Sequence, residues 1–147
     1  MRFTAIDRFI ERNDAFVLTA HETPDADALG SEVAMREILR KLGKDAVILN
    51  ADPAPGMFEF LDPESVVRVI KDESSIPPDI EQRALIILDV NDIGNIGSLA
   101  ELVVPRIREY FILDHHEREG STTRDNLIEE DASSTCELLF DLAEHLE

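Results

Sequence analysis

The chain has 147 residues, a length that fits one domain with its own hydrophobic core. Its formal charge of −18 at pH 7 would repel nucleic acid backbones and anionic membrane surfaces, which excludes a protein that holds long RNA or DNA in a basic groove. The single cysteine, Cys136, excludes an intrachain disulfide, and the sequence contains neither a signal-peptide region nor an apolar stretch of membrane-spanning length. We therefore expect a cytoplasmic protein that does not bind a membrane.

The first part of the chain alternates between helical and extended patterns. Apolar residues recur at helical spacing over residues 3–10 and again over residues 35–42, where Gly43 supplies a stop signal for the second helix. Between these two helices, residues 15–20 form a short apolar run typical of a buried strand, and residues 21–27 form a polar loop.

The middle of the chain adds three predicted strands, at residues 46–49, 66–70 and 84–88. The stretch 51–56 contains two prolines and predicts a loop, and residues 71–83 predict a charged connection. The run at 84–88 is the most strongly apolar strand in the chain.

The last part of the chain continues the alternation. We expect a short helix over residues 98–104, a strand at 110–113, a loop at 120–125 and a short strand at 126–128. Ser133 or Ser134 can cap a final helix, whose apolar residues are Leu138, Leu139, Leu142 and Leu146. Strands that alternate with helices and are apolar on both faces predict an α/β fold with a mainly parallel sheet flanked by helices, in one domain over residues 1–147.

Polar clusters follow three of the predicted strands. His21, Asp25 and Asp27 follow the first of them, Asp89 follows the strand at 84–88, and Asp114-His115-His116 follows the strand at 110–113. Because ligands bind at the carboxyl ends of parallel strands, these side chains should converge on one edge of the sheet. The alternative for any one cluster is local: Asp25 and Asp27 as turn residues, and Asp89 as a loop cap.

Carboxylates and imidazoles without thiolates suit Mn²⁺, Mg²⁺, Fe²⁺ or Zn²⁺. The candidates suffice for two ions, one held by His21, Asp25 and Asp89 and the other by Asp27, Asp89 and His115. Asp89 would then bridge two ions roughly 3.5–4 Å apart, an arrangement found in hydrolases that attack phosphorus.

Two helix starts are candidate phosphate sites. Gly30 and Ser31 lie near the start of the helix after the first cluster, and Ser133 and Ser134 open the final helix. The alternatives are glycine packing for Gly30 and helix capping for the serines, and capping is the favoured interpretation for the second pair.

Taken together, these residues resemble the DHH phosphoesterase family, and most closely its nanoRNase and pAp-phosphatase branch. The motifs are His21-x-x-Pro24-Asp25-x-Asp27-Ala28-Leu29-Gly30-Ser31, Leu88-Asp89, Asp114-His115-His116 and Ala132-Ser133-Ser134-Thr135-x-Glu137. The resemblance implies a Rossmann-like three-layer domain, two Mn²⁺ ions and a substrate that is a short oligonucleotide or 3′-phosphoadenosine 5′-phosphate (pAp). It also implies roles at the third motif: His115 holds the second metal, Asp114 fixes the His115 imidazole from behind, and His116 contacts the phosphate or assists the leaving group.

The chain departs from the family pattern in two places. Asn95 stands where the family usually has an arginine shortly after the second-motif aspartate. The family also adds, beyond the last motif, a further metal-ligand aspartate and a smaller basic C-terminal substrate domain, which would follow Glu147. We therefore expect the N-terminal portion of a DHH protein, incomplete at its C-terminal end.

The leading functional prediction is a two-metal phosphoesterase for short oligonucleotides or small nucleotides such as pAp, or its N-terminal catalytic portion. One alternative is a non-catalytic metal- or nucleotide-binding module, and another is a DHH-type inorganic pyrophosphatase. Magnesium or another divalent metal could replace manganese. The sequence leaves open whether the protein forms a homodimer.

Overall fold

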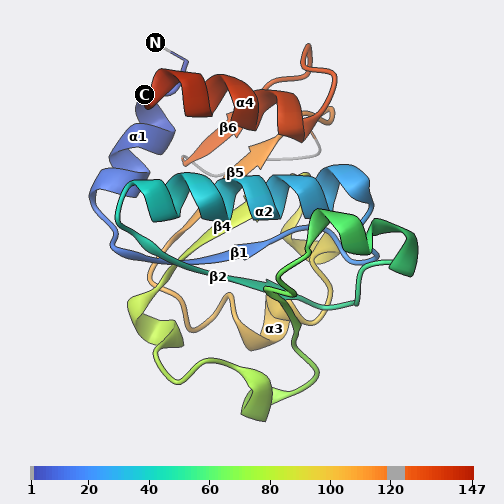
Figure 1. Cartoon of the computed structure of the whole chain (residues 1–147). Coiled ribbons are helices and arrows are strands. Elements are labelled where there is room, and N and C mark those ends of the chain that lie inside the picture. The colour runs from blue at the N-terminus through green and yellow to red at the C-terminus, as the bar shows by residue number, and fades with distance from the viewer. Residues whose placement is uncertain (1, 119–124) are drawn as a thin grey trace.

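A six-stranded parallel sheet forms the centre of the computed structural model, which describes residues 2–118 and 125–147 (Figure 1). The strands are β1 Ala15–Thr19, β2 Asp45–Asn50, β3 Val67–Val69, β4 Ala84–Leu88, β5 Tyr110–Asp114 and β6 Asn126–Ile128. The helices are α1 Thr4–Glu11, α2 Ala26–Lys41, α3 Leu99–Leu102 and α4 Thr135–His145, and the 3₁₀ turns are η1 Gly56–Leu61, η2 Glu73–Ser75, η3 Ile80–Gln82 and η4 Ile93–Asn95. The predicted α/β class, with a parallel sheet flanked by helices, is confirmed.

The strand order β3-β2-β1-β4-β5-β6 places the topological switch point between β1 and β4. From β1 the chain builds one half of the sheet through β2 and β3, and then it crosses back to build the other half from β4. Loops leaving β1 and β4 therefore diverge to opposite sides, which opens a crevice at the carboxyl ends of these neighbouring strands.

Both faces of the sheet are buried, as the continuous apolar strands predict. On one face, α1, α2 and α4 cover a core that includes Phe16, Ile86 and Phe111 (Figure 1). On the other face, α3 and short 3₁₀ turns cover residues of opposite parity, such as Val17 and Ile87. A strand buried on both faces has no solvent-facing positions, so it is apolar at every residue.

Two helix ends follow the predicted signals. Gly43, with φ +75°, lies just after α2 in the left-handed conformation that ends many helices. Ser134 is the N-cap of α4, and its hydroxyl accepts the Glu137 N–H at 3.0 Å, which confirms the capping interpretation. The helix predicted at 98–104 is shorter than expected, and α3 covers only the single turn Leu99–Leu102. The loop predicted at 120–125 lies outside the described residues apart from Asp125.

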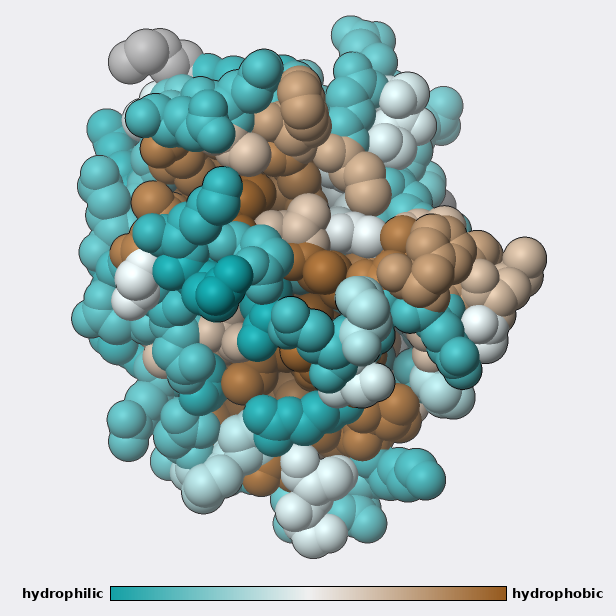
Figure 2. Space-filling view, viewed as in Figure 1, coloured by the Kyte–Doolittle hydropathy of each residue, from teal (hydrophilic) through white to brown (hydrophobic). Residues whose placement is uncertain are grey.

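Large hydrophobic side chains are exposed on η1 and also on α4, where Phe140 is exposed. Met57 and Phe60, on η1, are strongly exposed, and a hydrophobic projection in Figure 2 lies where Figure 1 has η1. Among residues 2–118 and 125–147, no helix combines the length and the apolarity needed to cross a membrane.

Candidate metal centre

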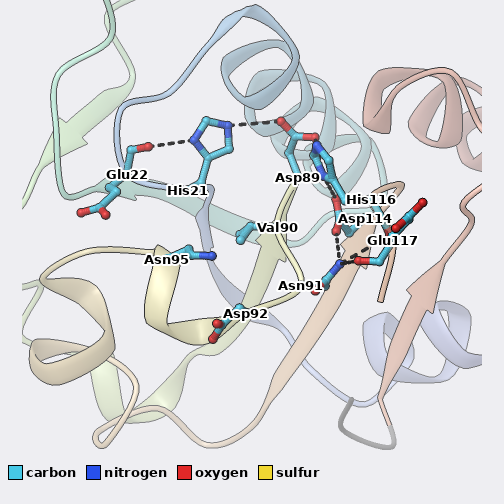
Figure 3. Close-up of a pocket in the computed structure, with 10 residues that line it drawn as sticks. All are labelled: His21, Glu22, Asp89, Val90, Asn91, Asp92, Asn95, Asp114, His116 and Glu117. Carbon is cyan, nitrogen blue, oxygen red and sulfur yellow. Dashed lines mark hydrogen bonds and ion pairs between the residues drawn. The ribbon is translucent and has the colours of Figure 1, made fainter. Parts of the chain in front are cut away.

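The three polar clusters meet at the carboxyl edge of the sheet, as expected for neighbouring parallel strands. His21 follows β1, Asp89 follows β4, and Asp114 ends β5 (Figure 3). The register aligns Leu18 with Ile86 and Leu88 with Leu113, so the three strands end at nearly the same level. Side chains that are about 70 and 25 residues apart in the sequence therefore surround one space.

Asp89 is the central residue of the site. Its side chain is only 2% exposed, and its φ of +62° is in the left-handed region that non-glycine residues rarely adopt. Thr135 donates its hydroxyl to Asp89 Oδ1 at 2.9 Å. Burial raises the pKa of the Asp89 carboxyl, and the nearby charge of Asp27 adds to this effect. A buried carboxylate beside another carboxylate is stabilised by a cation.

His21, Asp25 and Asp89 form the first potential ligand group. His21 Nε2 lies 3.4 Å from Asp89 Oδ2 and 3.7 Å from Asp25 Oδ1. The ring is oriented by its Nδ1, which lies 2.8 Å from the Glu22 carbonyl oxygen. The Asp89 carboxylate raises the pKa of His21 to about 9, against the effect of partial burial. This position therefore favours a positive charge, whether from a proton or from a metal ion.

Asp27, Asp89 and His115 come together as the second predicted group. His115 Nε2 lies 3.6 Å from Asp27 Oδ2 and 3.6 Å from Asp89 Oδ1. The two Asp27 oxygens accept the N–H groups of Cys136 and Thr135, each at 2.9 Å, at the start of α4. Although burial acts in the other direction, these hydrogen bonds lower the pKa of Asp27. Asp27 therefore stays ionised beside Asp89.

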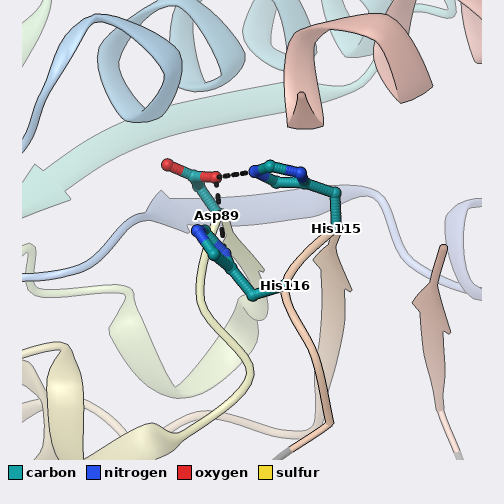
Figure 4. Close-up of side chains that lie close together, drawn as sticks. All are labelled: Asp89, His115 and His116. Atoms are coloured by element: carbon teal, nitrogen blue, oxygen red, sulfur yellow. Dashed lines mark ion pairs between the residues drawn. The ribbon is translucent and has the colours of Figure 1, made fainter. Parts of the chain in front are cut away.

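Asp114 supports a different imidazole from the one predicted. Its Oδ1 lies 2.7 Å from His116 Nδ1, whereas His115 Nδ1 faces the Ala132 carbonyl oxygen at 3.3 Å. The prediction that Asp114 fixes His115 is wrong. Both rings face Asp89 and lie next to each other (Figure 4), but only His116 has its Nδ1 against Asp114. Although partial burial disfavours the charged ring, the hydrogen bond to the fully buried Asp114 raises the pKa of His116.

The donor set fits divalent cations. Among residues 2–118 and 125–147, His21, Asp25 and Asp89 form one group whose ligand atoms lie within 4.8 Å of one another, and Asp89, His115 and His116 form another. Both groups share Asp89, and both consist of carboxylate oxygens and imidazole nitrogens. Ligand atoms bound at about 2.0–2.2 Å to a tetrahedral ion lie about 3.3–3.6 Å from one another, so the separations of 3.4 and 3.7 Å around His21 Nε2 are already close to those that a bound ion needs.

Residues 15–147 match the protein family described as "DHH family, N-terminal domain". This match agrees with the motifs of the chain and with the geometry of the site. The chain belongs to the DHH family. Two curated DHH relatives come from Bacillus subtilis (strain 168). The bifunctional oligoribonuclease and PAP phosphatase NrnA is 26% identical over 95% of this chain, and the cyclic-di-AMP phosphodiesterase GdpP is 22% identical over 96% of it. Both relatives hydrolyse phosphate esters, which supports a phosphoesterase at the level of the family.

The same fold occurs in a solved structure of an exopolyphosphatase-related protein from Bacteroides fragilis, with a TM-score of 0.82 and 23% identity over 97% of this chain. This chain covers 43% of that protein, 41% of NrnA and 23% of GdpP. The region shared with each relative is therefore the DHH domain, and each relative has further sequence outside it.

The predicted substrate-binding residues of the DHH motifs do not all reach the site. Ser31 is fully buried, and its hydroxyl lies 3.4 Å from Cys136 Sγ. A Cβ at Gly30 would lie 3.1 Å from the same sulfur, so Gly30 allows α2 and α4 to pack closely. This arrangement favours the packing interpretation of Gly30 and gives no support to a substrate contact by Ser31. Burial raises the pKa of the Cys136 thiol to about 11, which agrees with a packing role.

The serines that open α4 are engaged in hydrogen bonds within the helix start. Ser133 donates from its backbone N–H and its hydroxyl to Glu137 Oε2, at 2.7 and 2.6 Å, while Ser134 caps the helix. The bonds that hold the start of α4 against Asp27 and Asp89 come instead from Thr135 and Cys136. A substrate contact by Ser133 or Ser134 stays a prediction.

Two supporting residues were missed at the sequence level. Asn91 donates to Asp114 Oδ2 at 2.9 Å and to the Glu117 carbonyl oxygen at 2.8 Å, which fixes the turn after β5. Thr135 holds Asp89, as described above. Both residues lie within or next to DHH motifs, since Asn91 is two residues after Asp89 and Thr135 ends the Ala-Ser-Ser-Thr segment. For Asn91 the available signal was a polar residue just after a buried strand, and for Thr135 it was the polar start of α4.

A cleft of about 340 Å³ opens beside the metal centre. It is lined by His21, Glu22, Asp89, Val90, Asn91, Asp92, Asn95, Asp114, His116 and Glu117 (Figure 3). The volume is at the lower end of the range for small-molecule sites.

Gly97 sets the loop that forms one wall of this cleft, and we expect its replacement by alanine to be destabilising. Its φ is +63°, and a Cβ would lie 2.6 Å from the Ala51 Cβ and 3.4 Å from the Glu22 Cβ. Gly97→Ala should lower the free energy of unfolding by about 2–4 kcal/mol, through backbone strain and overpacking together. Urea denaturation measures this loss.

Gly43→Ala is the matched control, because Gly43 has a similar φ of +75°, but a Cβ there would meet none of the described atoms beyond its chain neighbours within 4 Å. It should cost only about 1 kcal/mol from the left-handed backbone. Equal losses in the two variants would contradict the steric part of the explanation for Gly97.

Proposed function

We propose that this chain is the N-terminal catalytic portion of a two-metal phosphoesterase that acts on short oligonucleotides or small nucleotides such as pAp, with Mn²⁺ as the metal. The observation that carries the proposal is Asp89, a buried carboxylate shared by two groups of potential ligands at the switch point of the sheet. The named activities of NrnA and GdpP support phosphate esters of nucleotides as the substrate class.

Two divalent ions would be held by His21, Asp25, Asp27, Asp89 and His115. When bound, such ions supply hydroxide near neutral pH and offset charge that develops on the phosphoryl oxygens. Thr135 and the start of α4 keep Asp89 and Asp27 in position, since they occupy one side of each carboxylate with hydrogen bonds.

His116 would act on the substrate side of the centre. Its Nδ1 is hydrogen-bonded to Asp114, and Asn91 in turn holds Asp114. These two bonds set the orientation of the ring. The half-exposed ring can then present Nε2 to a phosphate oxygen or to the leaving oxygen. Asp114 is a positioning residue in this scheme.

Hydrolysis by the purified chain tests the proposal directly. With Mn²⁺, we expect phosphate release from pAp or cleavage of a dinucleotide, and we expect EDTA to abolish both. Metal binding without turnover would favour the non-catalytic module, and much faster hydrolysis of inorganic pyrophosphate would favour a pyrophosphatase. Absence of both metal binding and turnover with Mn²⁺, Mg²⁺ and Zn²⁺ would rule the proposal out.

A further inference from the structure

Glu32 is a buried carboxyl group that lies outside both groups of potential metal ligands. Its side chain, on α2, is 0% exposed, so a segment outside this domain cannot contact it. Asn50 donates to its Oε2 at 3.0 Å, whereas Oε1 has no hydrogen-bond partner within the described residues. Within residues 2–118 and 125–147, this carboxyl therefore binds a neutral amide and no lysine or arginine, which leaves a charge on it without a partner.

Buried polar groups connect Glu32 to the strand that leads to His21. Asn50 is the last residue of β2, and its Oδ1 lies 3.4 Å from the hydroxyl oxygen of Thr19, the last residue of β1. Both side chains are buried, and His21 follows Thr19 after one intervening residue. Glu32 therefore lies against the carboxyl ends of β1 and β2, close to the metal centre.

Charges of the metal centre act on Glu32. Burial raises the pKa of its carboxyl to about 8. The positive charge of His21, after β1, opposes this effect, whereas the negative charges of Asp62, after η1, and Asp89, after β4, add to it. Glu32 follows Asp25, the N-cap of α2, by about two turns of helix or roughly 10 Å. At such a distance in a protein, one unit charge changes a pKa by about one.

Two divalent ions make the centre more positive whatever protons they displace. The ions bring four positive charges. Even when His21 and Asp89 each release a proton and one bound water ionises to hydroxide, the centre gains one positive charge. Ionised groups that keep their charge on binding, in this domain or outside it, cancel from the difference. Metal binding therefore favours the ionised form of Glu32.

We propose that Glu32 carries a proton in the metal-free protein and releases it when the metal centre is filled, which couples metal binding to a carboxyl group that is not a ligand. The O–H bond of Glu32 breaks, the carboxylate keeps the electron pair, and the proton passes to the buffer. The coupling is reciprocal, so ionised Glu32 strengthens metal binding. The inference rests on the two-metal centre of the proposed function, but it does not require turnover.

Calorimetric titration of the chain with Mn²⁺, in two buffers of different ionisation enthalpy, counts the protons that metal binding releases. At pH 7.5 wild type should release about 0.5–0.7 proton per chain more than Glu32→Gln, whose amide keeps the shape of the neutral acid. This excess should fall to about 0.2 or less at both pH 5.5 and pH 8.5. The affinity of wild type for Mn²⁺ should equal that of Glu32→Gln at pH 5.5 and exceed it by about tenfold or more at pH 8.5.

Infrared difference spectra observe the proton directly. The metal-free wild type should show, at pH 7.5, a carboxylic-acid C=O band that Glu32→Gln lacks, and Mn²⁺ should remove most of this band. Glu37→Gln is the matched control, because Glu37 lies on the same helix but pairs with Arg36 and Arg40 at the surface. It should release as many protons as wild type and keep the band.

The readouts separate this inference from the phosphoesterase proposal. Equal proton release by wild type and Glu32→Gln at pH 7.5, or a Glu32 band that persists with Mn²⁺, overturns the inference whether or not the chain hydrolyses a substrate. Mn²⁺ binding with the expected proton excess but without turnover supports the inference while the phosphoesterase fails. A chain that binds no Mn²⁺ overturns the inference as well.

Discussion

Asp89→Asn should weaken both metal sites together, lowering the affinity for Mn²⁺ by at least about 100-fold and the rate of hydrolysis by at least about 1,000-fold. The physical reason is that one buried carboxylate belongs to both ligand groups. Asparagine keeps the size of the side chain and an oxygen that can accept from Thr135, and it tolerates a φ of +62° better than most residues. The loss would therefore report on the lost charge rather than on misfolding.

Isothermal titration with Mn²⁺ measures the affinity and stoichiometry of both sites. Asp25→Asn is the matched single-site variant, because Asp25 belongs to the first group alone and asparagine preserves its capping bond to the Ala28 N–H. It should weaken one site and spare the other. Asp14→Asn, which removes an exposed partner of Lys44, should change neither site. Unchanged stoichiometry and affinity in Asp89→Asn would show that the bridging assignment is wrong.

Glu32→Gln should stabilise the protein progressively as the pH rises from about 5 to about 9, by roughly 3–5 kcal/mol at the upper end. Glu32 lies on α2 and is fully buried; its Oε2 accepts from Asn50 at 3.0 Å, while Oε1 has no partner within the described residues. Burial raises its pKa from 4.5 to about 8. In this interval the folded protein retains a proton that the unfolded chain releases, so stability falls as pH rises through it.

Urea denaturation in EDTA measures this dependence, because chelation removes the separate effect of pH on metal binding. The difference between wild type and Glu32→Gln should level off above the folded pKa. Glu37→Gln, on the same helix but paired with Arg36 and Arg40 at the surface, should shift stability by less than about 1 kcal/mol at any pH. If the free energy of unfolding varied with pH in the same way in wild type and Glu32→Gln, ionisation of Glu32 would not destabilise the folded protein.

Fold prediction succeeded where local patterns carry the information. Val17, Ile86 and Ile112 belong to runs that are apolar at nearly every position, and such runs require a sheet covered on both faces. Because parallel strands align their carboxyl ends, the polar residues after β1, β4 and β5 could be assigned to one site before their distances were known. The order of the DHH motifs then indicated the family.

Prediction failed where a side chain has several possible partners that are about equally far away along the sequence. Asp114 could have supported either neighbouring histidine, and only the turn after β5, held by Asn91, directs His116 to it. Ser31 resembles a phosphate-binding serine in sequence, but the close packing of α2 against α4 buries it against Cys136. No local pattern marks Glu32 as buried, yet its side chain is fully buried and accepts a hydrogen bond from Asn50 on β2.

The sequence by itself determined the α/β class, the succession of strands and helices, and the chemical types gathered at the site, because periodicity and strand-end polarity are local properties of the chain. The tertiary structure alone decided that β1, β4 and β5 lie side by side, that Asp114 holds His116, and that Ser31 is buried against Cys136. These features depend on the crossover between the two halves of the sheet, which brings together residues that no local pattern relates.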